Sequence, residues 1–181
     1  MREEFKVTIN TPEGCQVSMD ADNLVIKGDK GELKRKFSNP LIKLELQDNN
    51  VTLNTKTSNK RTKKLQNTFI AHINNMFKGV VEGHIYKLKI CSGHFPMTVS
   101  VKNNMFEIKN FIGEKVPREL KITEGTSVKI DGTEIVVEGI GKEKVGQMAA
   151  SIEQLTKRPG FDKRIFQDGI YITEKDGKII K

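Results

Sequence analysis

Apolar and polar residues alternate along residues 1–54 of the chain. The alternation is clearest at Phe5, Val7 and Ile9, and groups with the same spacing follow at Leu24 and Ile26; Ile42, Leu44 and Leu46; Val51 and Leu53. A period of two places apolar side chains on one face of a strand. Turn-forming residues separate these groups, so we predict a small antiparallel sheet with one buried face.

The spacing of the apolar residues changes from Ser58 onward. One stripe at helical spacing is formed by Leu65, Phe69, Ile73, Met76 and Phe77. This stripe predicts an amphipathic helix, and Gly79 is its predicted end.

The same order of strands followed by a helix begins again after Gly83. Strand-like apolar groups are Ile85, Leu88 and Ile90; Met97, Val99 and Val101; Phe106 and Ile108; Val128 and Ile130; Ile135 and Val137. A second helix is predicted from about Lys142, because Val145, Met148, Ala149, Ile152 and Leu155 keep helical spacing.

The repeated order predicts an α+β fold with two tandem duplicated domains. Each domain is expected to be a small, mainly antiparallel sheet packed against one α-helix, over residues 1–82 and 83–156. Residues 157–181 have no counterpart in the first half and are expected to form a C-terminal extension. The alternative is that two unrelated sheet-and-helix domains match by chance.

The charge of the chain favours an anionic partner. The 181 residues include 31 Lys and Arg against 23 Asp and Glu, a net charge of +8 that the two halves share. Such a balance points to nucleic acid or, less often, an acidic membrane surface. The sequence has neither a signal region nor an apolar run long enough to span a membrane, so we expect a soluble, cytosolic protein.

Catalytic, cofactor and metal motifs are not recognisable in the sequence. Gly139, Gly141 and Lys144 lie where a phosphate-binding turn would need a third glycine, and lysine occupies that place. The histidines are dispersed, and Cys15 and Cys91 lack metal-ligand spacing, so we expect two unbonded thiols. We therefore expect no enzymatic activity, no cofactor and no metal.

Basic residues gather in three places. The first cluster lies where the first predicted helix begins: Lys60, Arg61, Lys63 and Lys64. Cations are unfavourable there because of the helix dipole, so bound phosphate would relieve them, although a solvated charged face is the alternative. The second cluster lies on two predicted loops: His94, Lys115 and Arg118. These side chains can donate to phosphate and ribose, and Phe95 beside them either stacks or packs in the core.

The third basic cluster follows the second predicted helix. It comprises Lys157 with Arg158 and Lys163 with Arg164, and the aromatic residues Phe161 and Phe166 lie among them. A basic, aromatic segment interrupted by Pro and Gly often becomes ordered on RNA, although a free linker has a similar composition.

Several segments resemble the archaeal version of large-subunit ribosomal protein six, a family that archaea share with eukaryotes. The matching segments are 86–90, 94–96, 110–115 with 117–118, 137–139 with 145–147, and 166–172. Residues 27–33 also resemble the family's glycine turn, with Asp29 in place of its proline.

The resemblance implies two duplicated domains and a structural role in the large ribosomal subunit. It further implies binding to large-subunit rRNA near the stalk base and the sarcin-ricin region, mainly through the second domain, with other ribosomal proteins as neighbours and translation factors nearby. Two alternatives remain open. A free-standing RNA chaperone or assembly factor would also be basic, and an RNA-modifying enzyme would need a cofactor pocket or nucleophile.

Overall fold

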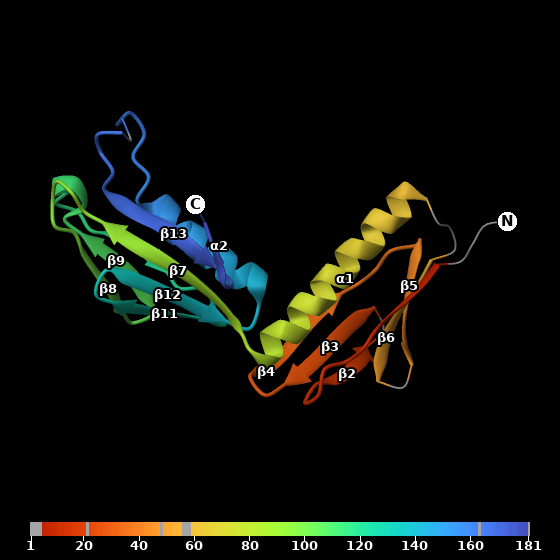
Figure 1. The fold of residues 1–181 in the computed structure, drawn as a ribbon. Helices are drawn as coiled ribbons and strands as arrows, with labels where there is room; N and C mark the ends of the chain where they lie inside the picture. Colours follow the sequence, from red (N-terminus) through yellow and green to blue (C-terminus); the bar gives the residue numbers. More distant parts are fainter. Residues whose placement is uncertain (1–4, 21, 48, 56–58, 163, 181) are drawn as a thin grey trace. The chain divides into compact units, whose positions relative to one another are not determined.

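The computed structural model describes residues 5–20, 22–47, 49–55, 59–162 and 164–180. The chain forms two compact units, Met1–Gly83 and His84–Lys181. Figure 1 shows the first unit in red to yellow-green and the second in green to blue. The division lies beside Gly83, where the apolar pattern changes from helical to strand-like spacing.

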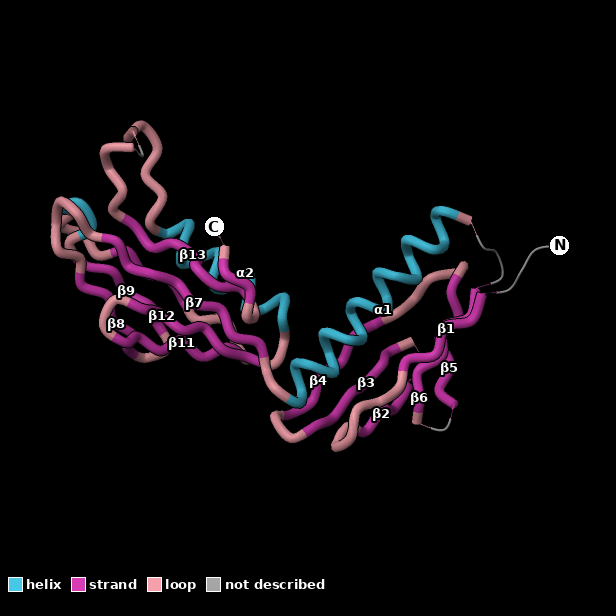
Figure 2. Tube along the Cα trace, in the orientation of Figure 1, coloured by secondary structure: helices cyan, strands magenta, loops and turns pink. Residues whose placement is uncertain are grey.

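The first unit contains two three-stranded antiparallel sheets and one helix (Figures 1 and 2). One sheet has the order β1-β6-β5, from β1 (Phe5–Ile9), β6 (Asn50–Thr55) and β5 (Ile42–Gln47). The other has the order β2-β3-β4, from β2 (Gln16–Asp20), β3 (Asn23–Gly28) and β4 (Gly31–Lys36). The helix is α1 (Lys60–Val81), and it contacts β3 and β4.

The presence of two sheets differs from the single sheet that we predicted for this unit. Strands β2 and β4 carry few buried apolar side chains, so their sequences show little alternation. They pair instead with the two edges of β3, whose Leu24, Val25 and Ile26 are all buried. Strands β2 and β4 therefore form because they pair with the buried strand β3, although their own sequences show a weak apolar pattern.

Helix α1 begins and ends at recognisable caps. The Asn59 side chain accepts from the Thr62 backbone N–H at 2.8 Å, and the Thr62 hydroxyl accepts from the Asn59 N–H at 3.0 Å. This reciprocal pair satisfies two donors at the helix start. The helix continues past Gly79, our predicted end, because Gly79 is buried within the helix and Gly83 supplies the left-handed conformation with φ of 81°.

The second unit also has two antiparallel sheets and one long helix. The larger has the order β11-β12-β7-β13-β14, from β11 (Thr126–Asp131), β12 (Glu134–Gly139), β7 (His84–Cys91), β13 (Gly169–Lys175) and β14 (Lys178–Ile179). The smaller has the order β10-β9-β8, from β10 (Arg118–Lys121), β9 (Met105–Lys109) and β8 (Thr98–Lys102). A single 3-10 turn, η1 (Phe111–Gly113), and helix α2 (Lys142–Leu155) complete the unit.

The core of the second unit lies between α2 and the two sheets. Helix α2 contacts β7, β12 and β13 of the larger sheet and β10 of the smaller one. The largest fully buried side chains of this core are Leu88, Phe106, Ile108, Phe111, Ile135, Met148, Ile152 and Ile170. Residues 157–181, which we expected as a separate extension, contribute β13, and β13 pairs with β7 from Gly169 to Lys175.

The two cysteines are free thiols in different units. Cys15 is buried, and burial, followed by the nearby charge of Asp29, raises the pKa of its thiol. Cys91 is partly exposed at the end of β7. Within the part of the chain that the structure describes, none of the helices is both long enough and apolar enough to cross a membrane.

Candidate nucleic-acid interface

Three connecting segments of the second unit meet at one place. They are the loop 92–97 after β7, the turn 110–117 after β9, and the segment 157–168 between α2 and β13. Hydrogen bonds join the first loop to the other two segments, from Gly93 to Asp168 and from Asn110 to Pro96. Glu114 of the turn lies 3.8 Å from Arg158 of the last segment. We call this group of segments the loop cluster. Residues separated widely in sequence are therefore brought into one surface.

The Asp168 carboxylate fixes the loop after β7. Its side chain is 1% exposed and accepts hydrogen bonds from the backbone N–H groups of Gly93 at 2.6 Å and His94 at 3.0 Å. The His94 Nδ1 lies 2.6 Å from its second oxygen. Burial is the largest influence on this carboxyl and raises its pKa, but the hydrogen bonds from His94 and Gly93 outweigh it and hold the pKa below its usual value.

A row of stacked side chains leads from His94 to Arg158. The His94 and Phe166 rings are 4.9 Å apart and tilted by 30°, and Phe166 meets Phe161 at 4.9 Å in an edge arrangement. The Arg158 guanidinium lies 4.3 Å from the centre of the Phe161 ring. Aromatic and cation–π contacts of this kind hold exposed rings in place at a surface.

Arg118 is held by interactions within the second unit. Its guanidinium makes two hydrogen bonds with the Glu114 carboxylate, at 2.7 and 2.6 Å, and donates to the carbonyl of Leu155 at the end of α2. It also lies 4.4 Å from the centre of the buried Phe111 ring. The hydrogen bond from Arg118 is the main reason why the pKa of Glu114 is lowered, against an opposing effect of burial.

The position of Arg118 differs from the loop that we predicted. It is the first residue of β10 and pairs with Ile108 of β9. Its guanidinium connects the turn 110–117 to the end of α2, which the sequence pattern does not indicate. Whether it also contacts RNA remains a prediction.

The turn 110–117 adopts an unusual backbone conformation. Asn110, Ile112 and Gly113 all have positive φ, at 57°, 48° and 75°. Glycine and asparagine tolerate this region, whereas a β-branched residue such as Ile112 is strained there at a cost of roughly 1–3 kcal/mol. The surrounding hydrogen bonds and the buried Phe111 must therefore hold the turn in this shape.

The remaining predicted cations have different surroundings. Lys115 is exposed on the turn 110–117, and Arg164 is exposed but paired with Asp162 at 2.9 Å. Arg158 is partly exposed, with its Nη1 3.8 Å from the Glu114 carboxylate. Lys163 lies outside the described residues. Of the described members of the second and third basic clusters, all but Arg118 lie on the segments of the loop cluster, and Arg118 follows the turn 110–117 directly.

The first basic cluster belongs to the other unit. Lys60, Arg61, Lys63 and Lys64 are all exposed on the first turns of α1, and that helix has no acidic residue in its first turn.

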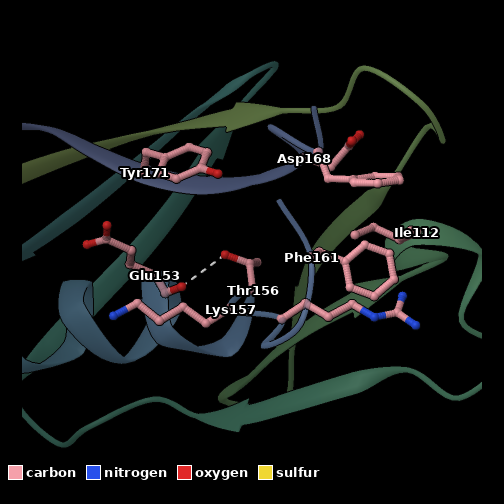
Figure 3. Close-up of a pocket in the computed structure, with 9 residues that line it drawn as sticks. Ile112, Glu153, Thr156, Lys157, Phe161, Asp168 and Tyr171 are labelled. Atoms are coloured by element: carbon pink, nitrogen blue, oxygen red, sulfur yellow. Dashed lines mark hydrogen bonds between the residues drawn. The ribbon is translucent and has the colours of Figure 1, made fainter. Parts of the chain in front are cut away.

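A small pocket opens within the loop cluster (Figure 3). Its lining comes from the turn 110–117, the end of α2, the segment after it and β13: Ile112, Glu153, Thr156, Lys157, Arg158, Phe161, Phe166, Asp168 and Tyr171. Burial and, next, the nearby Cys91, Asp168 and Glu153 raise the pKa of Tyr171, so its hydroxyl keeps its proton at neutral pH.

Sequence reasoning missed the residues that organise this surface. Asp168, Glu114 and Tyr171 lie in the segments that carry the family resemblance, but nothing in their spacing indicates that they meet. In the described ranges, no group of three or more His, Cys, Asp and Glu side chains is arranged to bind a metal.

Two copies of a sheet-and-helix unit and a cluster of basic, aromatic loops define a duplicated α+β protein with the features of a nucleic-acid-binding protein. The model of the family described as "Ribosomal protein L6" matches residues 11–83 and 95–169, one segment in each unit. The chain therefore belongs to the ribosomal protein L6 family.

Two relatives match this chain over nearly its whole length. The "Large ribosomal subunit protein uL6" of Methanosarcina mazei is 48% identical over 175 residues, which cover 97% of this chain and 99% of the relative. The protein of the same name from Methanococcus vannielii is 44% identical over 180 residues, which cover 99% of this chain and 97% of the relative. These matches confirm the predicted family, its archaeal version and the duplicated α+β class. A ribosomal protein is a structural component of the cytoplasmic ribosome and not an enzyme, as we predicted.

Proposed function

We propose that this protein is a structural component of the large ribosomal subunit and binds large-subunit rRNA chiefly through the loop cluster of its second unit. The observation that carries the proposal is the ordered set of cations and aromatic rings around the buried Asp168. Cations held at a surface neutralise phosphates, while exposed rings offer stacking surfaces to unpaired bases.

The proposed location on the rRNA is near the stalk base and the sarcin-ricin region, close to where translation factors bind. The family resemblance supports this location, and the names of the two relatives support the large subunit. Other large-subunit proteins are proposed neighbours. The exposed cations of α1, Lys60, Arg61, Lys63 and Lys64, offer a second and weaker contact with rRNA phosphates.

Sedimentation of ribosomal subunits in high salt tests the proposal. A structural component is expected to co-sediment stoichiometrically with large subunits after a high-salt wash. Loss of the protein in that wash would contradict the proposal and favour a free-standing RNA chaperone or assembly factor, the second candidate that the sequence left open.

The salt dependence of rRNA binding tests how the contact is made. The logarithm of affinity should fall linearly with the logarithm of salt concentration, with a slope of about 0.7–0.9 per neutralised phosphate. Binding that does not respond to salt would instead indicate an apolar or small-molecule partner. Purified large-subunit rRNA and the full chain are sufficient for this measurement.

A further inference from the structure

The pocket in the loop cluster has an aromatic wall that is only partly covered. Phe161 is 37% exposed, and its neighbours Phe166 and Arg158 hold it from two sides at 4.9 and 4.3 Å. Ile112 adds an apolar side chain to the lining. A planar, apolar surface of this kind suits a flat ligand that stacks on a ring.

The polar part of the lining faces the same space. Figure 3 shows the Tyr171 hydroxyl directed toward the middle of the lining, with Thr156 and Lys157 below it and Phe161 across from it. The Thr156 hydroxyl is already engaged, donating to the Glu153 carbonyl at 2.9 Å and accepting from the Ile170 N–H at 3.0 Å. By contrast, none of the described residues forms a hydrogen bond with the Tyr171 hydroxyl, which is therefore available to a ligand.

An exposed lysine in the lining offers a contact for an anionic group beside the flat one. Lys157 and Arg158 both line the pocket, and Lys157 is exposed. The lining also contains two acids, Glu153 and Asp168, and the Asp168 carboxylate is engaged by two backbone N–H groups and by the His94 ring 2.6 Å away. Cations beside an aromatic wall are the combination that binds a base together with its own phosphate.

We infer that this pocket receives one unpaired nucleotide of the RNA, with its base against Phe161, its polar edge at Tyr171 and its phosphate at the exposed Lys157. The inference rests on the proposed RNA-binding function and adds how part of the RNA is recognised: a base turned out of its helix, rather than the shape of a duplex alone. An apolar ligand would leave Lys157 and the Tyr171 hydroxyl without a ligand contact, and a lone phosphate would make no use of the aromatic wall.

The pocket is ordered before the nucleotide arrives. Asp168 holds His94, His94 stacks on Phe166, and Phe166 meets the edge of Phe161. The turn that carries Ile112 is held by Asn110, whose side chain donates to the Pro96 carbonyl at 3.0 Å. A preformed site spends less binding free energy on ordering its own side chains.

Stacking is tested with a short single-stranded RNA that contains 2-aminopurine, a fluorescent base whose emission is quenched when it stacks on an aromatic ring. The full chain should quench this RNA, and the same RNA with an abasic site at that position should bind about tenfold or more weakly. A matched duplex without unpaired bases should bind without comparable quenching.

Variants at Phe161 separate stacking from folding. Phe161→Leu should abolish the quenching and weaken binding of the single strand about tenfold or more, whereas Phe161→Tyr, which keeps a ring, should retain both. Ile85→Ala is the control, because Ile85 is 39% exposed, close to the value for Phe161, and lies on β7 outside the loop cluster. Circular dichroism checks that each variant is folded.

Two outcomes distinguish this inference from the proposed function. If Phe161→Leu is folded and still quenches the 2-aminopurine RNA, or if the abasic RNA binds equally well, the nucleotide pocket is wrong while rRNA binding stands. If the unmodified chain fails to bind large-subunit rRNA at all, the proposed function fails first.

Discussion

The His94 Nδ1 lies 2.6 Å from the Asp168 carboxylate, and this contact joins two loops that are 74 residues apart in sequence. Because the same carboxylate accepts two backbone N–H groups, it determines the shape of the loop after β7. The contact therefore links the folding of the second unit to the candidate interface.

Asp168→Asn should lower the free energy of unfolding at neutral pH by about 1–3 kcal/mol, because a charged acceptor is lost at a buried site. The pKa of Asp168 is lowered in the folded protein, so its stabilising contribution is present above the unfolded pKa of about 4 and is lost as the pH falls through the folded value. Urea unfolding of the variant and of the unmodified protein, at neutral pH and near pH 3, measures the contribution of Asp168 to the free energy of unfolding. The difference between the variant and the unmodified protein should shrink in acid, and an unchanged difference would contradict the assignment.

Arg118→Ala should destabilise the second unit, whereas Lys115→Ala should not. The Arg118 guanidinium satisfies Glu114 and the Leu155 carbonyl, so its removal is expected to cost about 1–3 kcal/mol. Lys115 is exposed, and its change is expected to stay within about 0.5 kcal/mol. Equal stabilities of the two variants in urea would show that Arg118 does not connect these segments.

Charge reversal should show which unit contributes more to rRNA binding. The double variant Lys115→Glu with Lys157→Glu places repulsion at the loop cluster, where both side chains are exposed. Its incorporation into large subunits should fall severely, since each charge-assisted contact contributes roughly 1.5–3 kcal/mol. Lys60→Glu with Lys64→Glu is the matched variant on α1 and should have a smaller effect.

Circular dichroism must show that both double variants are folded before incorporation is compared. Normal incorporation of the loop variant together with loss of the α1 variant would place the main RNA surface on the first unit instead.

Gly28→Ala should destabilise the first unit through a steric clash. A Cβ at Gly28 would lie 2.9 Å from Val80 Cγ2 and 3.0 Å from the Val80 carbonyl oxygen. The neighbouring Lys30 N–H donates to that carbonyl at 3.0 Å, so the turn cannot easily move away from α1. We expect a loss of about 1–3 kcal/mol in thermal or urea unfolding. Gly93→Ala is the control, because a Cβ there would meet nothing within 4 Å.

The apolar pattern predicted both helices and most strands of the two units, but not β2, β4, β10, β13 or β14. Helix α1 buries Ile73, Met76 and Phe77 of its predicted stripe, and α2 buries Val145, Met148, Ala149 and Ile152. These elements are predictable because each buries an apolar face, and burial leaves a period in the sequence. The family resemblance could likewise be recognised from the sequence, because it depends on short segments of adjacent residues.

Only the tertiary structure determined which side chains meet in the loop cluster. Asp168 and Glu114 are single acidic residues in a chain rich in charges, and their partners, such as His94 and the Leu155 carbonyl, become neighbours only when strands and helix pack. For the same reason Arg118, which we predicted as a loop cation, is found within a network of hydrogen bonds. The spacing of apolar residues reflects burial along one helix or strand. A binding site depends instead on distances between elements, and these distances are set by the packing of the whole unit.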